Sequence, residues 1–326
     1  MTLEITAIVE RFPARGQFII ARGAKTYVDV LVVAASDGIH IGMGEGTAIY
    51  YHGETAEKCL ARVMEVADAL YPLGVMAAKD AVQSLMPPGA ARNALDCALW
   101  DLAARAAGVP LWLYAGLKSA PQSLVTAFTI SLGEAAAMQA DAEKAAAAGF
   151  GLLKLKLTGN GDRERVAAVR AGAPAARLIV DANESWTDMD VAAEAAALAA
   201  LGVEMIEQPV AAGQDALLDG VISPVPILAD ESCQSLADLE NCARYYDGIN
   251  IKLDKAGGLT EALAMARSAE ARGLKVMVGC MLSTSLGIAP AFLVAQNVQW
   301  VDLDGPALLA QDREDGFHFT DGMITI

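Results

Sequence analysis

The sequence predicts an α/β barrel that follows a smaller α+β domain. From about residue 123 onward, short apolar segments alternate with Ala-rich helical stretches, and each pair is about as long as one βα unit. In the first hundred residues strands come first and helices follow without alternation. A doubly wound open sheet is the alternative, but no G-x-G-x-x-G pattern follows an early strand.

The N-terminal part contains three expected strands and two expected helices. Residues 1–12, 26–36 and 39–48 are expected strands, and Ser36-Asp37-Gly38 between the last two is typical of a hairpin turn. Helices are expected over 54–71 and 91–107, where apolar residues recur at helical spacing. Strands followed by helices indicate a small α+β domain.

The rest of the chain contains eight expected strands. The helical stretches between them, such as 134–149 and 191–201, are rich in alanine but carry charges, which is typical of helices on a protein surface. Eight consecutive units match a (β/α)8-type barrel. The strands are expected at 124–130, 152–157, 177–182, 203–207, 226–230, 248–253, 275–279 and 299–303.

The composition excludes some function classes. The chain has 326 residues, with 40 acidic and 24 basic side chains and a net charge of −16. Nucleic acids and anionic membranes are therefore not expected partners, because both are bound through clustered Lys and Arg. No apolar stretch reaches the roughly 20 residues of a membrane span, and no signal peptide is visible. Five cysteines without a C-x-x-C pair fit a cytoplasmic location.

Charged residues recur at the ends of the expected barrel strands. The second strand carries Lys154 and Lys156 on one face, and the sixth carries Lys252. Such residues are seldom buried without a partner, and barrel active sites form at the C-terminal ends of strands. The pattern therefore predicts an active site there. The acidic residues at strand ends are Asp181, Glu207, Asp230, Asp302 and Asp304.

Each of these residues alone has a simpler structural explanation. Asp181 could cap a helix, K-x-K could be a solvated strand end, and Asp304-Gly305-Pro306 could be only a turn. Three carboxylates on adjacent strands, flanked by lysines on the second and sixth, are harder to explain in this way. Oxygen donors without His or Cys suit Mg2+. Lysines on opposite sides, with pKa values lowered by burial and the cation, could remove and return an α-proton.

The sequence resembles the muconate-lactonising subgroup of the enolase superfamily over nearly its whole length. The segment ARNALDCALWDLAARAAGVPL resembles the capping-domain helix of that family. The resemblance implies a modified (β/α)7β TIM-type barrel over residues 119–305. It also implies an N-terminal α+β capping domain over 1–118, completed by the C-terminal tail 306–326. The segments that carry the resemblance are Lys154-x-Lys156, Asp181-Ala182-Asn183, Glu207-Gln208-Pro209, Asp230-Glu231-Ser232 and IKLDKAGG from Ile251 to Gly258.

The resemblance also implies roles for individual residues. Lys156 and Lys252 would be the two acid/base catalysts, and Lys154 would neutralise the substrate carboxylate. Lys255, three residues after Lys252, is expected to point to the other face as a strand-end charge. One Mg2+ per subunit would be bound by Asp181, Glu207 and Asp230.

Within this subgroup, the run VDLDGP from Val301 to Pro306 resembles the dipeptide epimerases. Asp302 and Asp304 are then expected to bind the ammonium group of the N-terminal residue of a dipeptide. An N-terminal loop around residues 15–25 would close over the barrel, where Arg22, or alternatively Lys25, would meet the Glu side chain. Thr129 and the stretch VGCMLST, which contains Cys280, are expected to line the substrate site.

The resemblance therefore implies a cytoplasmic isomerase with a small dipeptide substrate. It would interconvert L-Ala-L-Glu and L-Ala-D-Glu by two-base 1,1-proton transfer through an enediolate, in murein peptide recycling. The alternatives are o-succinylbenzoate synthase, muconate cycloisomerase, N-acylamino acid racemase, a dipeptide epimerase of different specificity, or a barrel that binds without turnover. The D-x-D acids argue against the first three, and the two lysines argue against a mere binder. The oligomeric state stays open, a homo-oligomer included.

Overall fold

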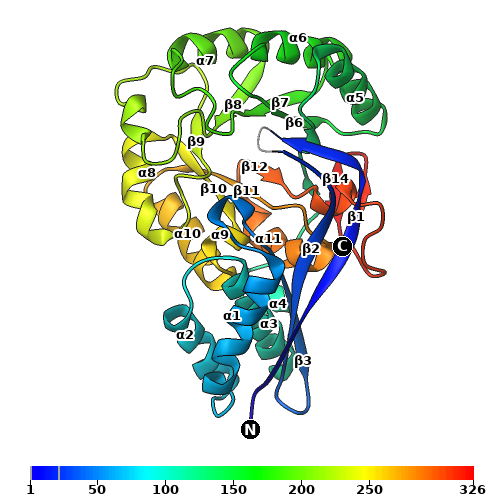
Figure 1. The fold of residues 1–326 in the computed structure, drawn as a ribbon, viewed down its shortest axis with the longest axis vertical. Helices are drawn as coiled ribbons and strands as arrows, with labels where there is room; N and C mark the ends of the chain where they lie inside the picture. The colour runs from blue at the N-terminus through cyan, green and yellow to red at the C-terminus, as the bar shows by residue number, and fades with distance from the viewer. Residues whose placement is uncertain (1, 21–22) are drawn as a thin grey trace.

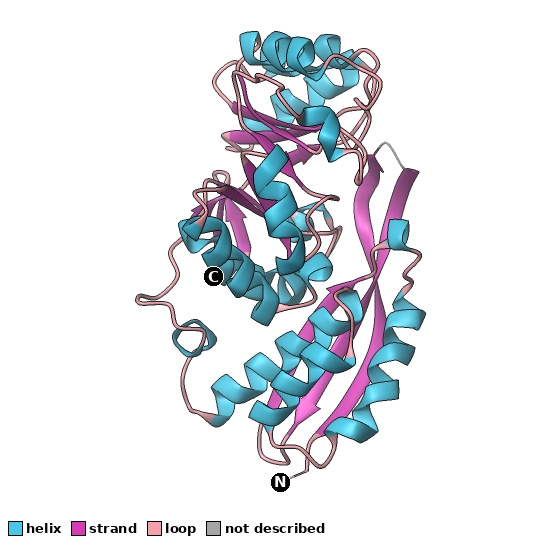
Figure 2. Cartoon of the chain, turned by 90° about the vertical axis from the view of Figure 1, so that its left-hand side faces the viewer, coloured by secondary structure: helices cyan, strands magenta, loops and turns pink. Residues whose placement is uncertain are grey.

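The computed structural model describes residues 2–20 and 23–326 of the chain. Figure 1 shows a sheet with helices in the N-terminal part and a barrel above it, and Figure 2 shows the same two parts from the side. This confirms the predicted fold class. No helix in the described ranges is long and apolar enough to cross a membrane.

The N-terminal part is a three-stranded antiparallel sheet with helices on one face. Its strands, in the order β1-β2-β3, are β1 (Glu4–Ile20), β2 (Gly23–Ser36) and β3 (Ile41–Thr47). Apolar side chains of the sheet pack on α1 and α3, and α2 packs against them. The helices are α1 (Ala56–Leu70), α2 (Val75–Leu85), α3 (Ala90–Ala106) and the short α4 (Leu111–Tyr114).

The expectation of a loop around residues 15–25 is wrong for the residues that the structure describes, because they lie in strands. Residues 15–20 and 23–25 belong to β1 and β2, which pair as far as Ile20 and Gly23. The pairing is interrupted between Pro13 and Phe18 and resumes from Phe18 with Lys25 onward. This long hairpin reaches from the capping domain toward the barrel (Figure 1).

Three glycines of β3 allow the sheet to lie very close to α3. They alternate along the strand, so all three face the helix. A Cβ at any of them would lie 2.1–2.3 Å from a backbone carbonyl oxygen of α3. A helix backbone cannot move aside locally, so only glycine fits. The facing pairs are Gly42 with Ala98, Gly44 with Ala94, and Gly46 with Ala90.

The C-terminal part is an eight-stranded parallel sheet that curls into a nearly closed barrel. Its two edges meet where Ala127, just before β5, donates its N–H to the carbonyl oxygen of Val301 in β12 at 2.8 Å. The strands, in the order in which they pair, are β5 (Phe128–Ile130), β6 (Leu152–Lys156), β7 (Arg177–Asp181), β8 (Val203–Glu207), β9 (Ile227–Ala229), β10 (Gly248–Lys252), β11 (Lys275–Gly279) and β12 (Trp300–Asp302).

Helices surround the barrel, but in the described chain the last strand is followed by no α-helix, only by a short 3-10 helix over Gly305–Leu308. After β12 the chain forms a tail in which β14 (Met323–Thr325) lies between β13 (His318–Thr320) and β4 (Leu124–Val125) and pairs antiparallel with both. This agrees with a (β/α)7β barrel. The helices are α5 (Ala135–Ala147), α6 (Asp162–Gly172), α7 (Val191–Ala200), α8 (Leu239–Tyr245), α9 (Leu253–Ala256), α10 (Leu259–Ala271) and α11 (Ser285–Val294).

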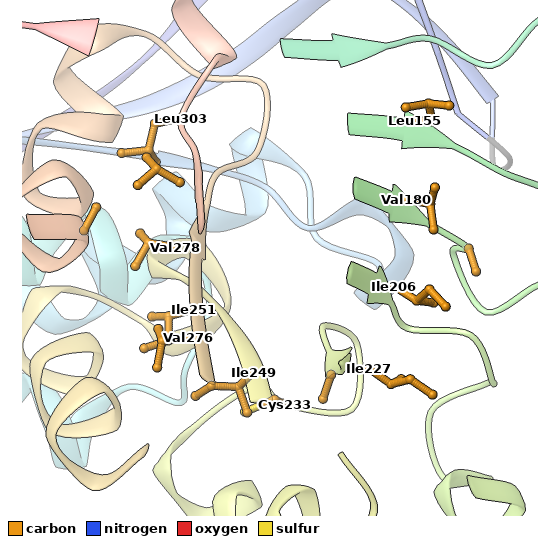
Figure 3. Packing of buried hydrophobic residues seen from close by; sticks show 14 of the residues in the cluster. Leu155, Val180, Ile206, Ile227, Cys233, Ile249, Ile251, Val276, Val278 and Leu303 are labelled. Atoms are coloured by element: carbon orange, nitrogen blue, oxygen red, sulfur yellow. The ribbon is translucent and has the colours of Figure 1, made fainter. Parts of the chain in front are cut away.

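Barrel strands alternate between an outer and an inner layer. Leu155, Val180 and Ile206 lie in a row on β6, β7 and β8 and belong to the layer between strands and helices (Figure 3). The inner layer is apolar near the N-terminal ends of the strands. Because the side-chain period is two, the next inward positions on β6, β7 and β8 are charged. The inner apolar residues are Ala127, Leu152, Ile179, Met205, Leu228, Met277 and Trp300.

Candidate active site

Three buried carboxylates meet at the C-terminal ends of three adjacent strands. Asp181 ends β7, Glu207 ends β8, and Asp230 directly follows β9. One carboxylate oxygen from each lies within 4.8 Å of the others. Three hard oxygen donors without nitrogen or sulfur fit a cation such as Mg2+ or Ca2+. This cluster could therefore hold a metal ion.

Lysines approach this cluster from both sides of the barrel. Lys156 Nζ lies 2.6 Å from Asp181 Oδ2, and Lys252 Nζ lies 2.7 Å from Asp230 Oδ2. Their strands, β6 and β10, are separated by three others in a sheet of eight, so they stand across the barrel from each other. Both ammonium groups thus face the space above the carboxylates.

Lys154 occupies the centre of the charged layer. Its Nζ lies 2.6 Å from Glu207 Oε2, 2.7 Å from Asp302 Oδ2 and 3.6 Å from Asp181 Oδ2. The side chain is almost fully buried. Lys154 therefore links the carboxylate cluster to the acids of strand β12.

The carboxylates of the cluster have different pKa values because their neighbours differ. Burial favours the neutral form of Asp181 and Asp230, but Lys156 and Lys252 outweigh burial, and both pKa values fall below normal. Burial and the nearby Asp181 charge raise the pKa of Glu207 to about 7. The site thus combines ionised carboxylates with one that titrates near neutrality.

The buried lysines are held in the charged form by these acids. Burial lowers the pKa of Lys154 and Lys252, but the carboxylates facing each of them outweigh it. Asp302 has the largest such effect on Lys154, and Asp230 on Lys252. Both pKa values therefore lie well above normal in these surroundings.

The residues expected around a substrate line one small cavity. It has a volume of about 30 Å³ and adjoins Lys154, Lys156 and Lys252. Asp304 Oδ2 accepts the backbone N–H of Thr129 at 2.7 Å, and burial followed by the Asp302 charge raises the pKa of Asp304 to about 7. The expected substrate contacts found in its wall are Thr129, Lys154, Cys280, Asp302 and Asp304.

Two expected substrate contacts cannot be placed. Arg22 lies outside the described residues, and for Lys25 only the backbone is described, as part of β2. The choice between them for the Glu side chain stays a prediction.

Lys255 was expected to be a strand-end charge, and this is wrong. Its Nζ lies 2.6 Å from Asp230 Oδ1, and the side chain is almost fully buried. The strand period does not apply, because β10 ends at Lys252 and α9 begins at Leu253. A helical turn brings the third residue back to the same side. The Gly257-Gly258 pair after the helix was the available signal for this turn.

Two further polar residues of the site were not predicted. Asn250 Nδ2 donates to Glu207 Oε1 at 2.6 Å from an inward position of β10, two residues before Lys252. Gln208 accepts the backbone N–H of Asp230 at 2.8 Å. The spacing of two residues from Lys252 was a usable signal for Asn250.

Two family descriptions match the two parts of this fold. Residues 4–116 match the mandelate racemase/muconate lactonizing enzyme N-terminal domain, and residues 137–326 match the enolase C-terminal domain-like family. The chain belongs to the mandelate racemase/muconate lactonizing enzyme family. The predicted resemblance to this group is confirmed.

Known members of this family are similar to the chain over almost its whole length. L-Ala-D/L-Glu epimerase from Escherichia coli is 44% identical over 315 residues, which are 97% of each chain. A solved enolase family member from Agrobacterium tumefaciens, with homology to dipeptide epimerases and bound sodium and L-Ala-L-Glu, has a TM-score of 0.93 and 45% identity, covering 99% of this chain and 97% of that one.

A more distant structure has the same fold. Dipeptide epimerase from Cytophaga hutchinsonii, complexed with Mg and D-Ala-L-Val, has a TM-score of 0.93 and 27% identity, covering 100% of this chain and 94% of that one. The chain is therefore an enzyme, and its relatives named as epimerases place it among the isomerases.

Proposed function

We propose that the chain is a Mg2+-dependent dipeptide epimerase that interconverts L-Ala-L-Glu and L-Ala-D-Glu. The observation that carries this proposal is the pair Lys156 and Lys252 on opposite sides of three buried carboxylates. Two bases across a barrel can act on the two faces of one carbon atom. The 44% identity to L-Ala-D/L-Glu epimerase and the L-Ala-L-Glu bound to a structural relative support the dipeptide.

The proton transfer needs one neutral and one protonated lysine. The neutral lysine takes the α-proton of the Glu residue from one face, and the protonated lysine returns a proton to the other. Asp181, Glu207 and Asp230 would hold Mg2+, which would bind the substrate carboxylate and offset the negative charge that raises the pKa of Lys252. Lys154 would add positive charge beside the same carboxylate.

Asp302 and Asp304 are proposed to bind the substrate ammonium. Asp302 Oδ1 is buried without a hydrogen-bond partner among the described residues, while its Oδ2 pairs with Lys154. Asp304 is fixed by the backbone N–H of Thr129. A buried acceptor beside a cavity gains most from a cationic group, which a free N-terminus supplies.

Location, pathway and domain limits complete the proposal. We propose that the enzyme acts in the cytoplasm in murein peptide recycling. The capping domain is proposed to span residues 1–118 with the tail 306–326, and the barrel 119–305. The matched ranges 4–116 and 137–326 support a division between the two.

Isotope exchange tests the activity directly. L-Ala-L-Glu incubated with enzyme and Mg2+ in D2O should acquire deuterium at the Glu α-carbon, seen by loss of the α-proton signal in NMR. EDTA should stop the exchange. N-acetyl-L-glutamate, which lacks the ammonium group, should react far more slowly. Faster turnover of N-acetyl-L-glutamate than of the dipeptide would contradict the dipeptide assignment.

Separate lysine variants test the two-base mechanism. K156A and K252A should each lose epimerisation by about 10²–10⁴-fold. Each variant should still exchange the α-proton of one diastereomer with solvent, because the remaining lysine acts on one face of the α-carbon. K156A and K252A should act on opposite diastereomers. Substitution of the exposed Lys275 provides the control. Epimerisation close to wild type in either variant would contradict the assignment.

A further inference from the structure

Gln208 has an unusual backbone conformation between two of the proposed metal ligands. It directly follows Glu207, its side chain is fully buried, and its φ is +36°. Residues other than glycine seldom adopt this left-handed conformation, which persists only where the surroundings hold it. Such strain often accompanies a functional constraint.

The side-chain amide of Gln208 bridges the ends of β8 and β9. Its Oε1 accepts the backbone N–H groups of Asp230, at 2.8 Å, and of Ser232, at 3.1 Å. Its Nε2 lies 2.8 Å from the carbonyl oxygen of Val210, 2.8 Å from Ser232 Oγ and 3.0 Å from the hydroxyl of Tyr246. The two backbone donors identify the carbonyl end, since a reversed amide would turn its hydrogens toward them.

A buried polar chain orients the partners of this amide. Ser232 Oγ donates to Asp215 Oδ1 at 2.5 Å, and the Tyr246 hydroxyl donates to the same oxygen at 2.6 Å. Asn241 Nδ2 donates to Asp215 Oδ2 at 3.1 Å. Because both hydroxyl hydrogens point to Asp215, both hydroxyl oxygens are free to accept from Gln208. This arrangement requires an amide donor at position 208.

We propose that Gln208 is a positioning residue that fixes the separation of Glu207 and Asp230 and thereby sets the affinity of the site for a divalent cation. This inference rests on the proposed metal-dependent function. Gln208 is joined to Glu207 by a peptide bond and to the backbone of Asp230 by a hydrogen bond. The carbonyl oxygen of Asp230 is held on the other side by Lys255. One amide therefore links the backbone segments that carry the two carboxylates.

The substitution Gln208→Met tests this role. Methionine keeps the length of the side chain but leaves the N–H groups of Asp230 and Ser232 without their acceptor. Mn2+ titrated into metal-free enzyme by calorimetry should bind about 10–100-fold more weakly than in the wild type. The Mn2+ activity titration should shift to higher concentration, with much of kcat recovered at saturation, which general destabilisation would not produce. An unchanged Kd in folded enzyme would overturn the proposal.

Gln299→Met is a control that removes the same kind of hydrogen bond at a more exposed position. Gln299 Oε1 also accepts a backbone N–H from the neighbouring strand, that of Val276 at 2.7 Å. It does so at the N-terminal end of β11, away from the carboxylates, so the Kd for Mn2+ should stay at the wild-type value. Weakening of the same size in both variants would overturn a role specific to Gln208.

Tyr246→Phe keeps the test decisive if the methionine variant does not fold. It removes one acceptor of the Gln208 amide, adds no charge and leaves the carboxylates in place. A several-fold weaker Kd for Mn2+ supports the proposal, and an unchanged Kd in this variant overturns it. Wild-type enzyme that binds Mn2+ but leaves dipeptides unchanged would contradict the proposed function alone. Wild-type enzyme that binds no divalent cation would overturn both.

Discussion

Two lysines reach Asp230 from opposite sides of its carboxylate. Lys252 contacts Oδ2 and Lys255 contacts Oδ1. Lys255 Nζ also donates to the carbonyl oxygens of Asp230, Cys233 and Asn250. These oxygens surround the ammonium group, which compensates for its removal from water. Lys255 thus ties the end of β9 to β10.

Lys255→Met should destabilise the fold strongly. The change leaves three carbonyl oxygens and one carboxylate oxygen without their buried cation, which should lower the free energy of unfolding by about 3–5 kcal/mol. Urea denaturation followed by circular dichroism measures this. Lys275→Met, on an exposed side chain at the start of β11, should change it by less than about 0.5 kcal/mol. Similar stability of the two variants would show that Lys255 has no such role.

Asp254 makes the stability depend on pH. Its Oδ1 accepts the backbone N–H of Thr47 and Nδ2 of Asn93, both at 2.8 Å, and burial raises its pKa to about 7 from 3.8. Between these pH values the folded protein keeps a proton that the unfolded chain releases. The contribution of Asp254 to stability therefore falls as pH rises from about 4 to 7.

Asp254→Asn should reduce the loss of unfolding free energy that accompanies the rise in pH. Asparagine carries no charge, and its Oδ1 can accept the same two hydrogen bonds. The decrease in unfolding free energy from pH 5 to pH 8 should be smaller in the variant than in the wild type, by urea denaturation at both values. Glu207 and Asp304, whose pKa values are also raised to about 7, should retain part of the decrease. Asp219→Asn, at an exposed site, should leave the decrease in unfolding free energy between pH 5 and pH 8 unchanged. A decrease in D254N equal to that in the wild type would contradict the prediction.

At the scale of elements, α3 connects the capping sheet to the barrel. One side lies on the glycines of β3, and the other contacts the chain that follows Lys252. Arg92 donates to the carbonyl oxygens of Ala256 and Gly257, and Asp96 accepts the backbone N–H of Thr260. The position of α3 on the sheet therefore bears on the chain next to the proposed catalytic lysine.

Gly44→Ala should disrupt this connection. The added Cβ would lie 2.1 Å from the carbonyl oxygen of Ala94 and 2.6 Å from the backbone nitrogen of Ala98. Sheet and helix must separate, which should cost about 1–3 kcal/mol or more, measured by thermal or urea unfolding. Gly151→Ala is the control, because nothing lies within 4 Å of its Cβ. A Gly44→Ala variant as stable as Gly151→Ala would rule out the close contact.

At the scale of the whole molecule, one arginine joins the tail, the barrel and the capping sheet. Arg313 Nη2 donates to Glu10 at 2.9 Å and to Glu45 at 2.8 Å, and its Nε donates to Thr284 Oγ1 at 2.7 Å. Glu45 is buried and also accepts the backbone N–H of Thr284 at 2.8 Å. Segments from both ends of the sequence therefore meet at one carboxylate.

Arg313→Met should loosen the tail. Glu45 would lose its charged partner while staying buried, so stability should fall by roughly 2–3 kcal/mol. Hydrogen exchange of backbone amides in residues 309–317 should become faster. Arg163→Met breaks an exposed pair with Glu194 and should cost less than about 1 kcal/mol. Unchanged exchange in the tail of R313M would contradict this role.

The sequence was most informative where a regular period held. Short apolar segments alternating with Ala-rich helical stretches located all eight barrel strands, and the step of two residues placed Lys154 and Lys156 on one face of β6. Prediction failed where the period changed: Lys255 follows a turn from strand to helix, and the bridge made by Gln208 depends on a backbone conformation with no local signal. The roles of the site residues, including Arg22 and Lys25, stay predictions.

The geometry of strand and helix limits how many residues of β3 can lie this close to α3. Every second residue of a strand advances by about 6.6–6.8 Å, whereas every fourth residue of a helix advances by about 6.0 Å. The two repeats fall out of step by somewhat less than 1 Å with each glycine. Over three glycines the accumulated offset between strand and helix positions stays small enough for close contact at each one. A further glycine along β3 would no longer lie opposite a helix carbonyl group. The difference between the two repeats therefore sets how far this close packing can extend before larger side chains take over.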